Sequence, residues 1–139
     1  MKKLILLSAL LFSFNGWTVG DFEKLTNFSL YYKDLRDVSE NLHRCSELFT
    51  AYSGYLEENT ESTLFSSYTS DQWKIQAIDT TLYAVSLQLF LGIPNKIDSF
   101  EDRFVRIAFY KDRLREAEIG NQDSKDFLFS DLQVCKNSI

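Results

Sequence analysis

The sequence predicts an all-α protein: a small antiparallel bundle of about four helices, held by one disulfide and preceded by a signal peptide. Three observations support this fold class. The 139 residues include one proline and five glycines, so little interrupts long helices. Apolar residues recur at alternating spacings of three and four, which is the period of a helix and not of a strand. The two cysteines lie far apart, and an even count in an exported protein favours a disulfide.

The first 20 residues have the layout of a secretory signal peptide. Two lysines precede an apolar run over residues 4–14, and small residues follow it. We expect cleavage after Thr18 or Gly20, which leaves residues 21–139 as a single helical domain. The apolar run is shorter than the ~20 residues that span a bilayer as a helix, so an uncleaved membrane anchor is the less favoured alternative. We therefore expect a periplasmic or secreted protein whose mature chain has no transmembrane helix.

The first helix of the domain is expected from about Lys33 to Glu58. Its apolar positions have the 3-4-3-4 spacing of a helix packed in a bundle. These positions are Leu35, Val38, Leu42, Cys45, Phe49, Tyr52 and Leu56. Ser39, Ser46 and Ser53 recur every seven residues beside them. Small side chains at this period would let a second helix approach closely, although a mildly polar flank would have the same pattern.

The second helix is expected to begin at a capping box of Thr69 and Gln72 and to end before Gly92 and Pro94. Its inward positions are predicted from the same spacing. They are Ile75, Ile78, Leu82, Val85 and Leu89, with Trp73, Ala77 and Phe90 beside them.

The third helix is expected between a capping box of Asp98 and Glu101 and a left-handed C-cap at Gly120. Its predicted inward residues are Phe100, Phe104, Ile107, Ala108, Leu114 and Ala117. The last helix is expected to be capped by Asp123 or Ser124. Its predicted inward residues are Phe127, Leu128, Leu132 and Cys135, with Ile139 as an optional last member.

The two cysteines occupy inward positions of the first and last helices, so we predict a Cys45–Cys135 disulfide. A zinc site would need about four ligands, and the only histidine, His43, is two residues from Cys45 and so on another face of the helix. The same geometry disfavours a thiol nucleophile with His43 as its base. In a reducing compartment the two residues would instead be buried free thiols.

The sequence contains no nucleophile elbow, phosphate loop, zincin helix or calcium loop. We therefore expect no cofactor and no enzymatic activity. A mechanism with two carboxylates stays open as an alternative, because its residues need not be close in sequence. The net charge is −5, and it becomes −7 once the leader with its two lysines is removed. A domain this acidic has no basic face for nucleic acid.

Aromatic residues are the most unusual feature of the composition, with 12 Phe, 7 Tyr and 2 Trp. Tyrosines outside a core are enriched at recognition surfaces, whereas half-buried tyrosines whose hydroxyls reach water are the alternative. The residues predicted for a binding surface are Tyr55, Tyr68, Tyr83, Tyr110, Arg103 and Arg106. The two arginines suggest either a site for an anionic ligand or an ion pair such as Asp79–Arg106 that fixes helix register.

These features favour a non-enzymatic interaction or accessory module that binds another periplasmic or envelope protein through an aromatic surface. The alternative is a carrier of small apolar ligands with a cavity between its helices.

Overall fold

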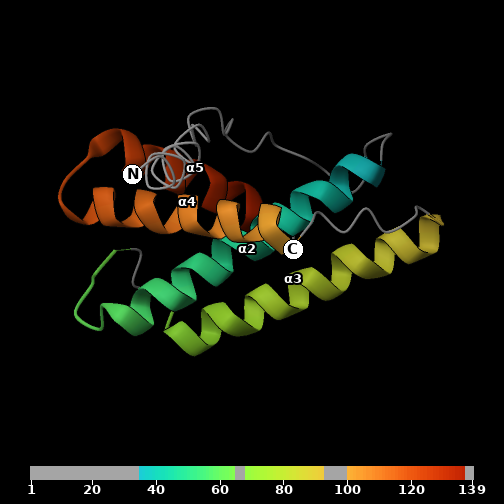
Figure 1. Ribbon diagram of the computed structural model, residues 1–139, viewed down its shortest axis with the longest axis horizontal. Helices are drawn as coiled ribbons and strands as arrows, with labels where there is room; N and C mark the ends of the chain where they lie inside the picture. The colour runs from blue at the N-terminus through green and yellow to red at the C-terminus, as the bar shows by residue number, and fades with distance from the viewer. Residues whose placement is uncertain (1–34, 65–67, 93–99, 137–139) are drawn as a thin grey trace, which may run out of the picture.

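The structure of the protein is a computed structural model that describes residues 35–64, 68–92 and 100–136. These residues form four α-helices and no strand, which confirms the predicted all-α class (Figure 1). The helices are α2 (Leu35–Glu58), α3 (Ser70–Leu91), α4 (Phe100–Glu118) and α5 (Gln122–Lys136). The predicted signal peptide (1–20), the segment that follows it, and the predictions for Lys33, Pro94, Asp98 and Ile139 lie outside the described residues.

The helices form two antiparallel hairpins (Figure 1). In one, α3 runs back along α2, and in the other, α5 runs back along α4. Helix α2 is central, because it packs against each of the other three helices. Helix α3 packs mainly on α2 and forms one edge of the described fold. One side of α3 is therefore turned away from the other helices.

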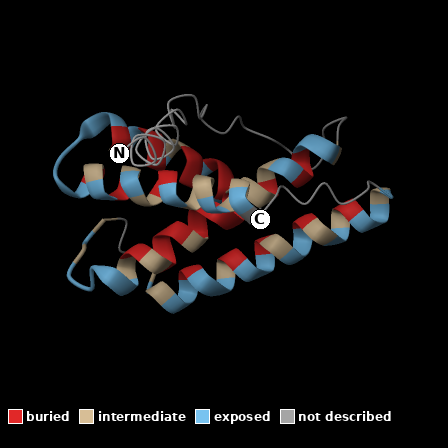
Figure 2. Cartoon of the chain, in the orientation of Figure 1, coloured by how far each residue is buried: buried red, intermediate tan, exposed pale blue. Residues whose placement is uncertain are grey.

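The central position of α2 explains its extensive burial (Figure 2). The predicted seam is confirmed from Val38 to Tyr52, whereas Leu35 and Leu56 at its ends are half-buried. Further residues on other faces of α2 are also buried, among them Leu48, Ala51 and Tyr55. A helix with neighbours on several sides needs apolar residues on more than one face.

The core is built around Trp73, the first large residue of α3. Its ring stacks on Tyr52 at 4.8 Å between centroids and lies 5.4 Å from Phe49. Tyr68 meets Trp73 edge-on at 5.0 Å. Offset and edge-on arrangements of this kind are favoured by the charge distribution of aromatic rings. Trp73 therefore holds the beginning of α3 firmly against α2.

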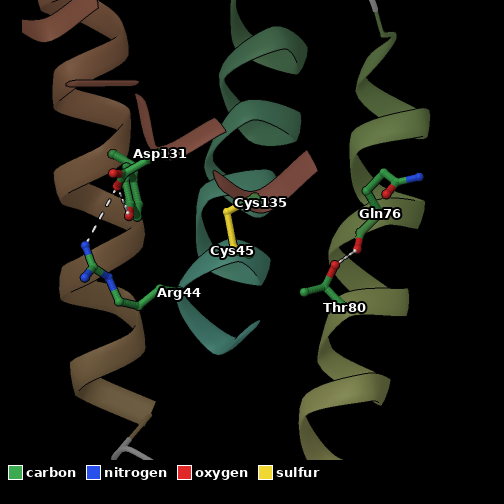
Figure 3. Close-up of a disulfide and its surroundings, with 7 residues drawn as sticks. Arg44, Cys45, Gln76, Thr80, Asp131 and Cys135 are labelled. Atoms are coloured by element: carbon green, nitrogen blue, oxygen red, sulfur yellow. Dashed lines mark hydrogen bonds and ion pairs between the residues drawn. A yellow bond between two sulfur atoms is a disulfide. The ribbon is translucent and has the colours of Figure 1, made fainter. Parts of the chain in front are cut away.

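The predicted disulfide is confirmed: Cys45 of α2 is bonded to Cys135 of α5, with their Cα atoms 5.6 Å apart (Figure 3). Both residues are fully buried. The bond links the two hairpins across 90 residues of chain. Beside it, Arg44 lies 3.8 Å from the buried Asp131, which also accepts a hydrogen bond from Tyr110 at 2.9 Å.

Most helix ends agree with the sequence analysis. Thr69 and Gln72 form the predicted capping box at the start of α3. Gly92 and Gly120 have positive φ angles of 61° and 99°, a conformation that glycine adopts without steric cost. The prediction of Asp123 or Ser124 as the cap of α5 is wrong. The cap is Asn121, whose Oδ1 accepts a hydrogen bond from the Ser124 amide at 3.0 Å, while the Ser124 side chain is buried inside the fold.

Candidate functional site

Beyond Trp73, helix α3 contacts α2 mainly through small residues. Ala77, Thr80 and Ala84 are buried, and all three have short side chains. They face the serines that recur every seven residues on α2, all of which are buried. Ser39 donates a hydrogen bond to the carbonyl oxygen of Ala84 at 3.3 Å, so the backbone of α3 lies close to α2. The close approach expected from the serine repeat is thus confirmed.

Two further hydroxyl contacts continue this interface. The hydroxyls of Ser46 and Thr81 lie 2.5 Å apart, and those of Ser53 and Ser70 lie 3.1 Å apart. Thr81 also donates to the carbonyl oxygen of Ala77 at 2.8 Å. Hydrogen bonds satisfy these polar groups at the helix contact and restrict how α3 can rotate on α2.

Val85 of the predicted α3 seam is half-buried, and Trp73 and Ala77 beside it are buried as predicted. The other predicted inward residues, together with Tyr83, point away from the fold, which contradicts the prediction for them. Their exposed fractions run from 54% to 84%. These residues are Ile75, Ile78, Leu82, Tyr83, Leu89 and Phe90, and we call them the outer face of α3. Figure 2 shows exposed residues along this edge of the helix and buried ones along the edge that meets α2. The prediction is wrong because small residues permit a closer helix contact than large ones do, so the small-residue face is the one that packs.

Asp79 lies among the residues of the outer face and is the only carboxylate of α3 between Ile75 and Phe90. It is exposed, and within the described part of the chain it has no ion-pair partner. A hollow at this point of the surface has Asp79, Leu82, Tyr83 and Ser86 among its lining residues. From Ile75 to Leu91, Asp79 is also the only charged residue of α3. The outer face is therefore an apolar strip with one negative charge near its middle.

A groove of about 380 Å³ lies beside the outer face, over α2. Its floor includes Ser46, Thr50 and Gly54 of α2, and Ile78 and Leu82 of α3 form part of one wall. Arg103 of α4 lines the groove as well.

An ion pair between Lys74 and Glu57, 2.7 Å apart, also lines the groove. The hydrogen bond from Lys74 holds the pKa of the Glu57 carboxyl below its usual value. The groove thus combines hydroxyls, apolar side chains and charges of both signs.

The ion pair proposed between Asp79 and Arg106 is replaced by another. Arg106 donates from Nε and Nη2 to the two carboxylate oxygens of Glu47, at 2.6 and 2.7 Å. Arg103 lies 3.7 Å from the same carboxylate. Glu47 is fully buried, and sequence reasoning missed it because Glu is usually exposed. Both arginines therefore have a structural partner, which weakens the hypothesis that they form an anionic-ligand site.

The six residues predicted for a binding surface do not form one surface. Tyr55 and Tyr110 are buried, so they are not available to a partner. Tyr55 donates a hydrogen bond to Glu118 at 3.3 Å. The pKa of Tyr55 is raised, mainly because its phenol is buried and secondly because the Glu118 carboxylate is close. Tyr68 is half-buried against Trp73, and the Lys136 ammonium lies 4.8 Å from its ring centroid. Tyr83 alone among the predicted tyrosines lies on the outer face, with an exposed fraction of 63%.

Two predicted inward residues of α4 are also exposed. Phe104 has an exposed fraction of 57%, and Ala108 is exposed as well. The buried side of α4 instead carries Phe109 and Tyr110, together with Leu114 and Ala117, which were predicted correctly. Arg106, one turn before Tyr110, also points toward α2, where it pairs with Glu47. The side of α4 that packs is therefore displaced by part of a turn from the predicted apolar seam.

Within the described residues, no group of three or more His, Cys, Asp and Glu side chains could hold a metal ion. In the same part of the chain, no helix combines the length and the apolar character needed to cross a lipid bilayer. Comparison of the chain with known protein families, with characterised proteins and with solved structures finds no match.

Proposed function

We propose that this protein is an exported, non-enzymatic interaction module that binds another protein through the outer face of α3. The observation that carries the proposal is the exposure of this face. Six large apolar side chains from Ile75 to Phe90 are each more than half exposed, although α3 has a close contact with α2 on its other side. Exposed apolar patches of this extent mark interaction sites in soluble proteins.

The composition of α3 supports the same conclusion. A helix that is apolar on all sides is normally buried on all sides. Helix α3 has one charged residue after Lys74, yet only the face that carries Trp73 and the small residues meets the rest of the described fold. A bound protein would complete the burial of this helix, with Tyr83 and Phe90 as the kind of aromatic anchors that dominate interface energies.

Export is the second part of the proposal. It is supported by the pattern of the first 20 residues and by the Cys45–Cys135 bond, because disulfides persist in oxidising compartments. The partner would then be a periplasmic or envelope protein, or one encountered outside the cell.

The alternative function, a carrier of small apolar ligands, has less support from the geometry. The groove over α2 is largely apolar but open to solvent, so it would leave much of a bound ligand exposed. A carrier would bury most of its ligand in a largely apolar pocket.

Site-specific photo-crosslinking in the native host tests the proposal. A photoreactive residue replaces Leu82 on the outer face, and the matched control places it at the exposed Asp126 of α5. We expect a discrete crosslinked protein from position 82, its loss when Ile78→Ser is added, and no such product from position 126. Equal crosslinking from both positions, or none from position 82, would contradict the proposal.

A further inference from the structure

From the outer face of α3 we infer that the partner presents an amphipathic helix whose apolar stripe is flanked by an arginine or lysine that pairs with Asp79. This inference rests on the proposed function and adds the chemistry of the partner. Asp79, a carboxylate without an ion-pair partner in the described chain, lies within the strip of side chains that a partner would cover.

Covering Asp79 without a compensating group would be unfavourable. Burial of an ionised carboxylate costs far more than burial of an apolar side chain, unless a cation or several donors replace the lost water. Ile75 and Leu82 lie one turn to either side of Asp79, so an occupant that covers both must also cover the carboxylate. The occupant must therefore bring a cation or several hydrogen-bond donors to the carboxylate.

The surroundings of Asp79 favour a cation. Tyr83 is one turn further along α3 and lines the same hollow, so its ring and hydroxyl are available to the incoming group. A guanidinium can pair with the carboxylate through two hydrogen bonds and also pack on an aromatic face. Ser86 adds a hydroxyl at the edge of the hollow.

A second copy of this chain that pairs through its own α3 does not meet the requirement. In a parallel two-fold pairing, Asp79 would face its own equivalent, which is unfavourable for like charges. In an antiparallel pairing centred on Leu82, Asp79 would lie opposite Val85, which has no charge. Pairing Asp79 with Lys74 would need a centre near residue 77, which would leave Leu89 and Phe90 uncovered, and Lys74 already pairs with Glu57.

The spacing of the apolar residues along the outer face favours a helix as the element that covers it. Ile75, Ile78, Leu82 and Leu89 lie on a 3-4 seam, which is the pattern that interlocks with a second helix. The 14 residue steps from Ile75 to Leu89, at 1.5 Å each, make the seam about 21 Å long, or about four helical turns. The net charge of −5 also attracts a basic segment from a distance.

Three synthetic helical peptides test this inference. They share an apolar stripe with the 3-4 spacing and differ at one central flanking position, which is Arg, Gln or Glu. Each is titrated against the full mature chain, against Asp79→Asn and Asp79→Lys, and against Leu82→Ser as the variant that damages the apolar strip. Asp71→Asn, which removes one carboxylate from the first turn of the same helix, is the control for net charge.

We expect the native chain to bind the Arg peptide about tenfold more tightly than the Gln peptide, because a charge-assisted hydrogen bond replaces a neutral one. This preference should vanish in Asp79→Asn, reverse toward the Glu peptide in Asp79→Lys, and persist in Asp71→Asn. Leu82→Ser should weaken binding of all three peptides.

Other outcomes separate this inference from the proposed function. Equal binding of the three peptides by the native chain, lost in Leu82→Ser, would overturn the role of Asp79 and leave the proposed function in place. Failure of every peptide to bind would overturn both. A concentration-dependent dimer abolished by Leu82→Ser would identify a second copy as the occupant and overturn the inference. Binding to phosphatidylcholine vesicles that depends on Leu82 would identify a lipid surface as the occupant and would also overturn the inference.

Discussion

Glu47 of α2 and Arg106 of α4 form a two-point ion pair that joins the two helical hairpins. Nε and Nη2 of the arginine lie 2.6 and 2.7 Å from the two oxygens of the carboxylate. The Glu47 side chain is fully buried, and that of Arg106 is 15% exposed. In a buried ion pair, the attraction between the charges does little more than compensate for the water that both have lost. The presence of the pair alone therefore does not imply a large gain in stability. Removal of one partner lowers stability much more, because the other charge is then buried without compensation.

Replacement of Arg106 by Met is expected to lower the free energy of unfolding by about 3 kcal/mol. The change keeps an apolar stem of similar length but removes the main cation beside a buried carboxylate. Urea denaturation followed by circular dichroism measures the effect. Glu58→Gln, which breaks the more exposed pair between Glu58 and Lys111, is the control and should leave the urea midpoint unchanged. Equal midpoints for Arg106→Met and the native chain would contradict this account.

Loss of the disulfide is expected to lower the free energy of unfolding by about 2–5 kcal/mol. The bond closes a loop of 90 residues between α2 and α5, and so restricts the unfolded chain strongly. Urea curves with and without reductant give the measurement. The double variant Cys45→Ala/Cys135→Ala should unfold at the lower midpoint and should not respond to reductant. A native midpoint that reductant leaves unchanged would show that the bond adds nothing to stability.

The serine positions of α2 are expected to tolerate alanine but not leucine. Ser39 lies 3.3 Å from the backbone carbonyl of Ala84, which leaves no room for a larger side chain. Ser39→Leu should lower the free energy of unfolding by about 1–3 kcal/mol through overpacking, whereas Ser39→Ala should cost about 1 kcal/mol for one hydrogen bond. Thermal unfolding of the two variants distinguishes them. Equal effects would mean that α3 is not held close to α2 by small residues.

The sequence predicts where the helices lie along the chain better than it predicts which face of each helix is buried. The seam of α2 was correct because a central helix buries its apolar residues wherever they lie. Most of the predicted seam of α3 was wrong because hydrophobic spacing cannot distinguish a face that packs on a neighbouring helix from a face that stays exposed. Ala77 and Ala84 carried the missing signal, since they match the serine repeat of α2 in size and spacing.

The pairing of charges was harder to predict than the helices. Glu47 is buried through contacts with residues that follow it by nearly 60 positions, and no local pattern indicates such a contact. The disulfide was predictable, by contrast, because two cysteines allow only one bond within the chain.

The stability of the fold is expected to fall as the pH rises above about 10, because of two buried tyrosines. Burial, followed by the nearby charge of Asp131, raises the pKa of Tyr52 and of Tyr110 above the value in an unfolded chain. Below pH 10 both phenols are protonated in both states, so their contribution is fully present. Above it the unfolded chain releases protons that the folded chain retains, and stability declines by about 1.4 kcal/mol per pH unit for each tyrosine.

Urea denaturation at several values between pH 9 and 11.5 measures this slope. Tyr110→Phe should have a shallower decline than the native chain, because one of the two buried phenols is gone. It should also be less stable at neutral pH, because Asp131 loses a hydrogen bond of 2.9 Å. Tyr83→Phe on the outer face is the matched control and should follow the native curve. An identical decline in Tyr110→Phe and the native chain would show that the buried phenols do not cause the loss of stability at alkaline pH.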